Sequence, residues 1–541
     1  MTIFRTPVSE LQANAKRNPS LPALKIPQGG SSETTWQTIT FSALERDVEL
    51  SARYWKDELS NIGVKHRAVV GLWFEGYAYL DIIHTWGLAR AGYIPQLISL
   101  RMTDPTVLYQ LLNQTEAVAL VYEPSFEASL AKSPLPIYSK PNVLAETEKF
   151  KELPLPPLWE SSNAEDVMMI YHTSGSTSGT PKLVPITSKW LDHTIYTAGD
   201  GLKSSKRSEG QPTGVAIGSL SHIGSSLLLW DLAYRGCCLM LPATIPYPPS
   251  DLRLMIEEYG LTFLNIFPPF LSAVLRTARQ DSGLLAALKR LDVIFYGGLN
   301  LDPVDETWAR SEGLPLANLF GSTELGIIMV ADPKENTGYL GFPPANKYDM
   351  VPLKDDIESS EYLLELVVPP EAPDCPHPSL RSPDGKFYSG DLFIEVEPGR
   401  YISKGRNDSW IKMETGGLCD TGSIESNVMQ TCGSDLVSAV VVVGAERPSP
   451  AIFVEPKDES VLHSTSDGSH SQGPVAEFQD EIFRRIISFH ERRFAHERID
   501  DARYILVVPQ GTLPRTATKG NIRRKEVEKV FKAVLDVLYA A

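Results

Sequence analysis

Cysteine is scarce in this chain, with five residues among 541 and no pair at a C-x-x-C spacing. This pattern argues against a disulfide scaffold or a zinc site, and favours a reducing compartment. No apolar run approaches the ~20 residues that a membrane-spanning helix needs. The first twenty residues also lack the apolar core of a secretory signal. These absences predict a cytoplasmic protein with no membrane span.

Positive charge is also in short supply, because 51 Lys and Arg face 67 Asp and Glu, for a net charge of −16. A nonspecific nucleic-acid binder needs a basic face, so we expect no nucleic-acid partner. An anionic ligand would have to be held by local basic groups. At 541 residues the chain exceeds the usual size of one domain, so we expect more than one.

The most informative stretch is Tyr171–Thr187, YHTSGSTSGTPKLVPIT, in which Gly, Ser and Thr dominate before Pro181 and Lys182. Glycines let backbone N–H groups turn towards oxyanions, hydroxyls add donors, and the lysine adds a positive charge. The apolar segment Val167–Ile170 before it predicts a buried strand, and Ser188–Tyr196 after it predicts a helix. The plain alternative is a flexible Gly/Ser turn.

The loop is not a Walker A motif, because Gly179 is followed by Thr180 and Pro181 and not by Lys and Ser/Thr. A kinase or GTPase of that type is therefore not expected. The loop remains a candidate polyphosphate site of another kind.

Strand-like and helix-like segments alternate through the middle of the chain. Strands are predicted at Gly214–Leu220, Cys237–Leu241, Leu261–Phe267 and Val293–Tyr296, and helices at Ser225–Tyr234, Ser250–Tyr259 and Pro269–Arg279. This rhythm predicts an α/β fold of parallel or mixed sheets covered by helices. Ligands in such folds bind at the carboxyl ends of strands.

The pattern changes after residue 403. Strands are predicted at Leu436–Val443, Ala451–Val454 and Arg503–Val508, and helices at Glu477–Arg493 and Ile522–Tyr539. We therefore expect a small mobile α+β domain at the carboxyl end.

Four further motifs follow the loop in order: LFGSTE at Leu319–Glu324, YSGDL at Tyr388–Leu392, GRNDSWIK at Gly405–Lys412 and LPRTATKGNIRR at Leu513–Arg524. Together the five resemble the signatures of the adenylate-forming (AMP-binding) superfamily, which includes acyl-CoA synthetases, aryl-acid ligases and peptide-synthetase adenylation domains. The chain departs from the usual pattern in three places. The loop has one extra residue, Leu183 replaces a glycine, and Lys519-Gly520 reverses the usual Gly-Lys order.

The resemblance implies ATP and Mg²⁺ as cofactors. Nucleotide contacts are implied for Thr173, Ser174, Gly175, Ser176, Thr177, Gly179, Lys182, Gly297, Gly298, Phe320, Gly321, Ser322, Thr323, Asp391 and Arg406. Among these, Asp391 would accept hydrogen bonds from both ribose hydroxyls. Oxygen ligands suit Mg²⁺, and Glu324 and Thr177 are the implied ligands.

The same resemblance implies catalytic roles for Lys519, His222 and Thr323, with Lys525 as the alternative lysine. It divides the chain into a large domain, residues 1–404, and a small lid domain, residues 405–541. Asp408 would be the hinge between them.

The predicted activity is ATP-dependent conversion of a carboxylic acid to an acyl-adenylate, with release of pyrophosphate, followed by transfer to a thiol. Coenzyme A is the favoured acceptor, because no L-G-x-D-S carrier segment follows Arg524. The alternative is an adenylation domain of a peptide-synthetase-like reductase, which loads a phosphopantetheine arm on a carrier domain. A third possibility is a non-catalytic nucleotide-binding protein, but the presence of Glu324, Asp391 and Arg406 argues against it.

The acid pocket is predicted around His222, Phe267 and Gly298. The segment Ala216–Trp230 contains no acidic residue, and a buried ammonium without a counter-charge would be costly. We therefore expect a small aryl or aliphatic acid without an α-amino group. The plainer interpretation of His222 is a residue that caps the start of a helix.

Overall fold

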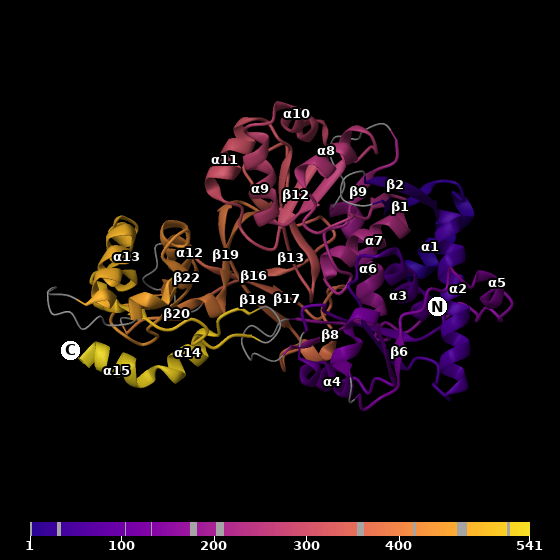
Figure 1. Cartoon of the computed structure of the whole chain (residues 1–541), viewed down its shortest axis with the longest axis horizontal. Helices are drawn as coiled ribbons and strands as arrows, with labels where there is room; N and C mark the ends of the chain where they lie inside the picture. Colours follow the sequence, from indigo (N-terminus) through magenta and orange to yellow (C-terminus); the bar gives the residue numbers. More distant parts are fainter. Residues whose placement is uncertain are drawn as a thin grey trace.

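The computed structural model describes residues 3–29, 34–102, 104–130, 133–173, 181–201, 210–353, 362–414, 418–462, 473–516 and 520–540. Figure 1 shows two lobes, with the elements that follow β19 (Arg400–Arg406) gathered at one end of the molecule. Apolar cores divide in the same way, because one cluster draws only on residues from Ile411 onwards and the others only on earlier residues. The division at residues 404/405 stays a prediction from the sequence.

One sheet of the large lobe carries the candidate phosphate loop, and its strands lie in the order β6-β5-β3-β4-β7-β8. Neighbouring strands are parallel except for the antiparallel pair β7–β8. The strands are β3 (Val69–Trp73), β4 (Ile94–Ile98), β5 (Ala119–Tyr122), β6 (Ile137–Ser139), β7 (Val167–His172) and β8 (Leu183–Thr187). The predicted strand before the loop is confirmed, whereas β8 was not predicted.

A second sheet has the order β2-β1-β10-β9, with β1–β10 and β10–β9 parallel. Its strands are β1 (Pro22–Gln28), β2 (Thr35–Thr40), β9 (Thr213–Val215) and β10 (Cys238–Met240). The predicted strand Gly214–Leu220 is too long. It ends at Val215, because the chain turns so that the Leu220 N–H can donate to the Gly76 carbonyl at 2.7 Å.

The third sheet of the large lobe is mixed and has the order β11-β12-β13-β14-β15-β19-β18-β17-β16. Strands β11 to β13 are parallel, and the rest pair antiparallel. Besides β19 the strands are β11 (Phe263–Ile266), β12 (Val293–Gly297), β13 (Leu316–Ser322), β14 (Gly326–Ala331), β15 (Leu340–Gly341), β16 (Asp349–Pro352), β17 (Leu364–Val368) and β18 (Phe387–Glu397). The predicted parallel α/β pattern is therefore confirmed, but it is distributed over separate sheets.

The helices of the large lobe cover these sheets (Figure 1). They are α1 (Pro7–Arg17), α2 (Phe41–Asn61), α3 (Tyr79–Arg90), α4 (Pro105–Gln114), α5 (Thr147–Phe150), α6 (Ser188–Gly201), α7 (Ile223–Arg235), α8 (Pro249–Glu257), α9 (Pro268–Ala278), α10 (Ser282–Arg290) and α11 (Pro303–Ser311). Short 3₁₀ turns lie at Pro124–Leu130 and Pro378–Leu380. The packing is apolar, as where Trp55 of α2 and Leu88 of α3 join Val70 of β3 in one cluster.

The small lobe contains an antiparallel pair, β20 (Trp410–Lys412) and β21 (Leu418–Asp420), and a sheet in the order β22-β23-β24. The latter strands are β22 (Val437–Val443), β23 (Ala451–Pro456) and β24 (Ile505–Val507). Its helices are α12 (Thr421–Cys432), α13 (Pro474–His490), α14 (Arg524–Val530) and α15 (Lys532–Ala540), and 3₁₀ turns lie at Asn407–Ser409, Glu459–Leu462, Ala495–Glu497 and Ala502–Tyr504. The prediction of one helix over Ile522–Tyr539 is wrong, because the chain breaks at Phe531, whose ring packs on Phe453.

The cysteines, Cys237, Cys238, Cys375, Cys419 and Cys432, are all buried, and none of them forms a disulfide. Among the described residues, no helix is both long enough and apolar enough to cross a bilayer.

Candidate active site

The mouth of the candidate phosphate loop is an antiparallel hairpin at the carboxyl end of β7. The Thr173 N–H donates to the Lys182 carbonyl at 2.9 Å, and the Lys182 side chain is exposed. The Ser99 N–H, just beyond the parallel strand β4, donates to His172 Nε2 at 3.0 Å. The loop therefore starts where two parallel strands end, which is the expected place for a ligand. The predicted contacts at Ser174, Gly175, Ser176, Thr177 and Gly179 lie outside the described residues.

The LFGSTE motif forms the end of β13 and the tight turn into β14. A side chain on Gly321 would place its Cβ 2.5 Å from the Gly326 carbonyl oxygen, so only glycine fits this turn. Thr323 and Glu324 are half-buried at its tip. Trp190 of α6 donates its indole N–H to the Glu324 carbonyl at 3.0 Å and fixes the turn from behind.

Gly297 ends the neighbouring strand β12, and Gly298 follows it. A Cβ on Gly297 would lie 2.0 Å from the Leu319 carbonyl oxygen, so this glycine lets β12 approach β13 closely. Gly298 is exposed, and a Cβ there would lie 3.9 Å from the Phe267 ring. The two glycines therefore bring the LFGSTE strand and the Phe267 region next to each other.

Asp391 and Arg406 come from separate motifs and meet across the β18–β19 pair, where they are direct partners. Arg406 Nη1 lies 3.5 Å from Asp391 Oδ1, and Arg406 Nε lies 3.3 Å from Asp408 Oδ1. Asp391 is only 7% exposed. Burial raises the pKa of the Asp391 carboxyl to about 6; the Arg406 charge opposes this shift, and the charges of Glu324 and Asp408 add to it.

This electrostatic coupling brings three motifs into one site. The charges of Glu324 from LFGSTE and of Arg406 and Asp408 from GRNDSWIK all act on Asp391. A carboxylate together with nucleotide phosphates is a donor set that Mg²⁺ commonly takes. Glu324 therefore fits a magnesium ligand. Among the described residues, no group of three or more His, Cys, Asp or Glu side chains forms a site that would hold a metal by itself.

Glu365 of β17 also belongs to this cluster, although no sequence motif marks it. Its Oε1 accepts a hydrogen bond from the Gly390 N–H at 3.1 Å. Burial raises the pKa of Glu365, against the opposing effects of this hydrogen bond and the Arg406 charge. Only the β17–β18 pairing reveals Glu365, because it lies beside Leu392 in the sheet register.

The lysine loop belongs to the small lobe, and Lys519 lies outside the described residues. Its base is firmly held, because Arg515 Nη2 pairs with the buried Glu455 at 2.6 Å and the Thr516 N–H donates to the Asn521 carbonyl at 2.8 Å. Lys525, the alternative lysine, is exposed in the first turn of α14.

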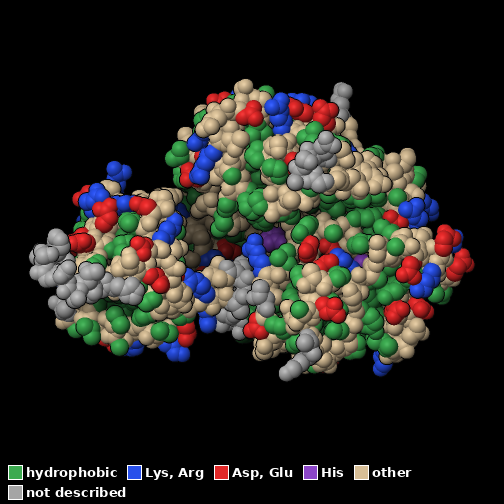
Figure 2. All heavy atoms as spheres, in the orientation of Figure 1, with side chains coloured by type: hydrophobic (Ala, Val, Ile, Leu, Met, Phe, Trp, Pro, Cys, Tyr) green, Lys and Arg blue, Asp and Glu red, His purple; other side chains and the backbone are tan. Residues whose placement is uncertain are grey.

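Figure 2 shows a hollow between the two lobes, and acidic, basic and histidine side chains lie next to it on the large lobe. The hinge candidate Asp408 lies in the 3₁₀ turn that connects the lobes. Arg524 of the small lobe donates to the Asp408 carbonyl at 2.8 Å, while the Asp408 side chain faces Arg406.

His222 is exposed at the start of α7, where its Nδ1 accepts a hydrogen bond from the Gly224 N–H at 3.2 Å. The interpretation of His222 as a helix cap is therefore confirmed. Its ring also stands edge-on to the Phe267 ring, with centroids 5.4 Å apart. The structure thus brings His222, Phe267 and Gly298 together, and the catalytic role of His222 stays a prediction.

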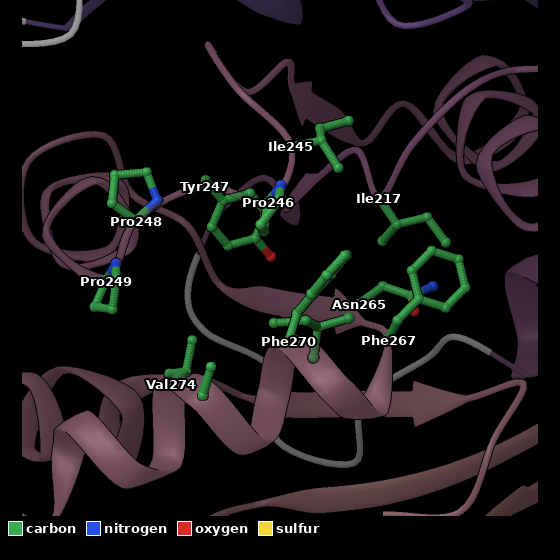
Figure 3. Close-up of a pocket in the computed structure, with 12 residues that line it drawn as sticks. Ile217, Ile245, Pro246, Tyr247, Pro248, Pro249, Asn265, Phe267, Phe270 and Val274 are labelled. Carbon is green, nitrogen blue, oxygen red and sulfur yellow. The ribbon is translucent and has the colours of Figure 1, made fainter. Parts of the chain in front are cut away.

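Next to Phe267 is a cavity of about 260 Å³, formed between the loop after β10 and the start of α9 (Figure 3). Apolar side chains of Ile217, Ile245, Phe267, Phe270 and Val274 dominate its walls. The walls around Phe267, a residue of the predicted acid pocket, are therefore mostly apolar.

Comparison with known proteins agrees with this geometry. Residues 11–356 match the family model "AMP-binding enzyme", and residues 408–541 match "AMP-binding enzyme C-terminal domain". The AMP-binding domain-containing enzyme iboA of Amanita muscaria (strain Koide BX008) is 31% identical over 94% of this chain and 98% of its own length. The adenylate-forming reductase stbB of Stachybotrys bisbyi is 24% identical over 85% of this chain, which spans only 41% of that reductase.

Solved structures share the fold at lower identity. The o-succinylbenzoate CoA synthetase of Bacillus subtilis, in complex with its acyl-adenylate intermediate, has a TM-score of 0.72 and 18% identity, over 96% of this chain and 97% of that chain. The anthranilate CoA ligase AuaEII, in complex with anthranoyl-AMP, has a TM-score of 0.70 and 18% identity, over 99% of both chains. With the family models covering most of its length, this chain belongs to the AMP-binding, adenylate-forming enzymes.

Proposed function

We propose that this enzyme binds MgATP and a small carboxylic acid, forms an acyl-adenylate with release of pyrophosphate, and transfers the acyl group to a thiol. The observation that carries the proposal is the meeting of Glu324, Asp391 and Arg406, which come from three separate motifs. A ribose needs a carboxylate that accepts hydrogen bonds from its hydroxyls, and a magnesium ion needs an oxygen ligand. A phosphate needs a positive charge.

The first step joins two anions, so its barrier is largely electrostatic. A carboxylate oxygen attacks the α-phosphorus, the bond from that phosphorus to the bridging oxygen breaks, and pyrophosphate leaves with the electron pair. Mg²⁺, when bound, neutralises phosphate charge. Asp391 would hold the ribose, Glu324 would orient the metal, and Lys519 would contact the carboxylate and α-phosphate oxygens. Catalysis then depends on positioning and preorganised charge.

In the second step the thiol sulfur attacks the acyl carbonyl, the thiol proton is lost, and AMP leaves. We favour coenzyme A as the acceptor, since two solved neighbours are named CoA synthetase and CoA ligase. A carrier-bound phosphopantetheine is the second candidate. It is supported by similarity to adenylate-forming reductases and a carboxylic acid reductase, of whose length this chain spans 41–43%.

Carboxylate-dependent ATP–pyrophosphate exchange tests the first step, because it needs no acceptor. We expect exchange with small aryl or aliphatic acids and weaker exchange with α-amino acids. The preformed acyl-adenylate is then offered to coenzyme A or to a phosphopantetheinylated carrier domain. If the carrier domain releases AMP faster than coenzyme A does, the carrier domain and not coenzyme A is the acceptor. A protein that binds adenosine but exchanges no acid would contradict the enzymatic function.

A further inference from the structure

The cavity beside Phe267 contains a polar group at an unusual place. Asn265 lies in β11, directly opposite the buried Phe295 of β12 in the sheet register. Because side chains alternate along a strand, Asn265 shares its face with Phe263. The apolar side chains of Phe263 and Phe295 therefore flank this half-buried amide on one face of the sheet, and Asn265 also lines the cavity.

The Asn265 amide makes no hydrogen bond with the described residues. It can donate two hydrogen bonds and accept two. A half-buried amide without a partner costs free energy unless water or a ligand satisfies it. In Figure 3 Asn265 comes from the strand beside Phe267, and Phe270 stands nearby on α9. The amide is thus available to a molecule that occupies the cavity.

Tyr247 supplies the other side-chain polar group among the described residues that line the cavity. Its hydroxyl oxygen is buried and has no hydrogen-bond partner in the described part of the chain. A tyrosine hydroxyl is neutral near pH 7, and burial raises the pKa of Tyr247 further. Because this oxygen is shielded from solvent, the ring of Tyr247 and not its hydroxyl forms the accessible wall.

Phe267 connects the cavity to the proposed reaction centre. It lines the cavity, its ring meets the edge of His222 with centroids 5.4 Å apart, and it faces Gly298. An acid whose carboxylate lies near His222 could therefore extend past Phe267 towards Asn265.

Size limits what can enter. An apolar protein cavity of about 150 Å³ already binds benzene. The cavity of about 260 Å³ therefore suits one aromatic ring with a short substituent, or an aliphatic chain of similar bulk, and excludes a long fatty chain.

We propose that this cavity binds the end of the acid remote from its carboxylate, and that Asn265 selects acids carrying an uncharged hydrogen-bonding substituent there. The substrate class is then a single-ring aryl acid, or a short aliphatic acid, with a hydroxyl or similar group. This inference rests on the proposed acid activation and names the class of acid.

The test compares matched acids in pyrophosphate exchange: benzoate with 3- and 4-hydroxybenzoate, and hexanoate with 6-hydroxyhexanoate. For the wild type we expect kcat/KM to favour the better hydroxylated member of a pair by roughly tenfold or more, since a site built for a hydroxyl rejects its absence. Asn265→Leu, which keeps the bulk, should bring that ratio to within about twofold. Adenosine affinity should stay unchanged, which shows that the variant folds.

Two further variants sharpen the assignment. Asn265→Asp should shift preference towards 4-(aminomethyl)benzoate, because a carboxylate pairs with an ammonium. Tyr247→Phe keeps the wall and removes only the shielded hydroxyl, so it should leave the hydroxylated-to-plain ratio unchanged. If the ratio of kcat/KM for the hydroxylated and plain acids stays high in Asn265→Leu, or if the wild type prefers the plain acids, this inference is overturned while the proposed function stands. Absence of exchange with every acid, in a wild type that binds adenosine, would overturn the proposed function and this inference with it.

Discussion

At the scale of single residues, Asp391 shows how burial and function oppose each other. Its carboxyl is 7% exposed, and burial raises its pKa to about 6, against the attraction of Arg406. The ordinary value for an aspartate is about 4. Below about pH 6 the folded free enzyme therefore favours the protonated form, whereas the unfolded chain favours it only below about pH 4. The resulting contribution to stability is lost as the pH rises from about 4 through about 6. Ribose hydroxyls, which donate to the ionised form, would reverse that preference.

Asp391→Asn should consequently separate stability from binding. At pH 7.5 we expect the free energy of unfolding of the variant to exceed that of the wild type by roughly 1–3 kcal/mol, because the buried charge is gone. Adenosine should bind less tightly, because the amide is a poorer partner for two hydroxyls. Wild-type affinity for adenosine should fall as the pH drops below about 6, whereas the affinity of the variant should stay level. Chemical denaturation and calorimetric titration measure both effects.

2′-Deoxyadenosine is the control for this experiment, since it lacks one of the two hydroxyls. The wild type should lose affinity for it, and Asp391→Asn should discriminate much less. If the wild type and Asp391→Asn discriminate equally between adenosine and 2′-deoxyadenosine, Asp391 does not bind the ribose.

A second residue-scale prediction concerns Lys519. Lys519→Ala should slow pyrophosphate exchange roughly a hundredfold or more, because it removes a charged contact made in the transition state. Transfer from a supplied acyl-adenylate to the thiol should be largely retained. Lys525→Ala is the matched comparison, and a larger loss of exchange in that variant would move the catalytic role to Lys525.

The family resemblance of two motifs named Asp391 and Arg406 as nucleotide contacts, and the β18–β19 register places these two residues side by side. The resemblance could not predict Glu365, since a carboxylate on a neighbouring strand becomes significant only through the pairing of β17 with β18. Trp190 was missed for the same reason. Its contact with the Glu324 carbonyl bridges 134 positions of sequence.

At the scale of elements, Arg524 at the start of α14 anchors the connection between the lobes. It donates to the Asp408 carbonyl at 2.8 Å and to the Val442 carbonyl at 2.8 Å, and pairs with Glu425 at 2.7 Å. One side chain thus holds the proposed hinge against β22 and α12. The position of the lysine loop depends on this anchor, because that loop leads directly into α14.

Arg524→Ala should therefore reduce pyrophosphate exchange roughly tenfold or more through misplacement of the small lobe, while adenosine affinity remains near wild type. Arg484→Ala is the control, since Arg484 is exposed on α13 and pairs within one helix with Glu481. Its exchange rate should equal that of the wild type. Normal exchange in Arg524→Ala would show that the hinge does not need this anchor.

Helices and strands whose sequences have a clear hydrophobic periodicity were predicted well, whereas those whose bounds depend on contacts with distant residues were not. Helix α9 and strand β12 agree with their expected ranges to within a residue or so. Strand β8 gave no signal, because two prolines flank or interrupt it and its pairing partner β7 lies across the loop. The break between α14 and α15 at Phe531 likewise depends on the Phe453 ring, with centroids 4.6 Å apart.

At the scale of the whole molecule, the two lobes have separate apolar cores. The small lobe's cluster contains Ile424, Phe453 and Ile482, whereas Ile294 belongs to a cluster built from α8 to α11 and strands around them. Lobes with independent cores can unfold independently and can move relative to each other. A rotation about Asp408 would need this independence.

Separate cores predict separate unfolding transitions, and two matched substitutions test this. Ile482 and Ile294 are both fully buried, one in each lobe. Replacing a buried isoleucine with alanine typically costs about 2–5 kcal/mol. Ile482→Ala should lower by several degrees only the midpoint temperature of the transition that adenosine does not shift. Ile294→Ala should lower only the midpoint temperature of the transition that adenosine raises. Differential scanning calorimetry with and without adenosine distinguishes them. If either substitution shifts one common transition by the same amount, the lobes unfold as a single cooperative unit, and the small lobe is not the independently moving lid that the hinge requires.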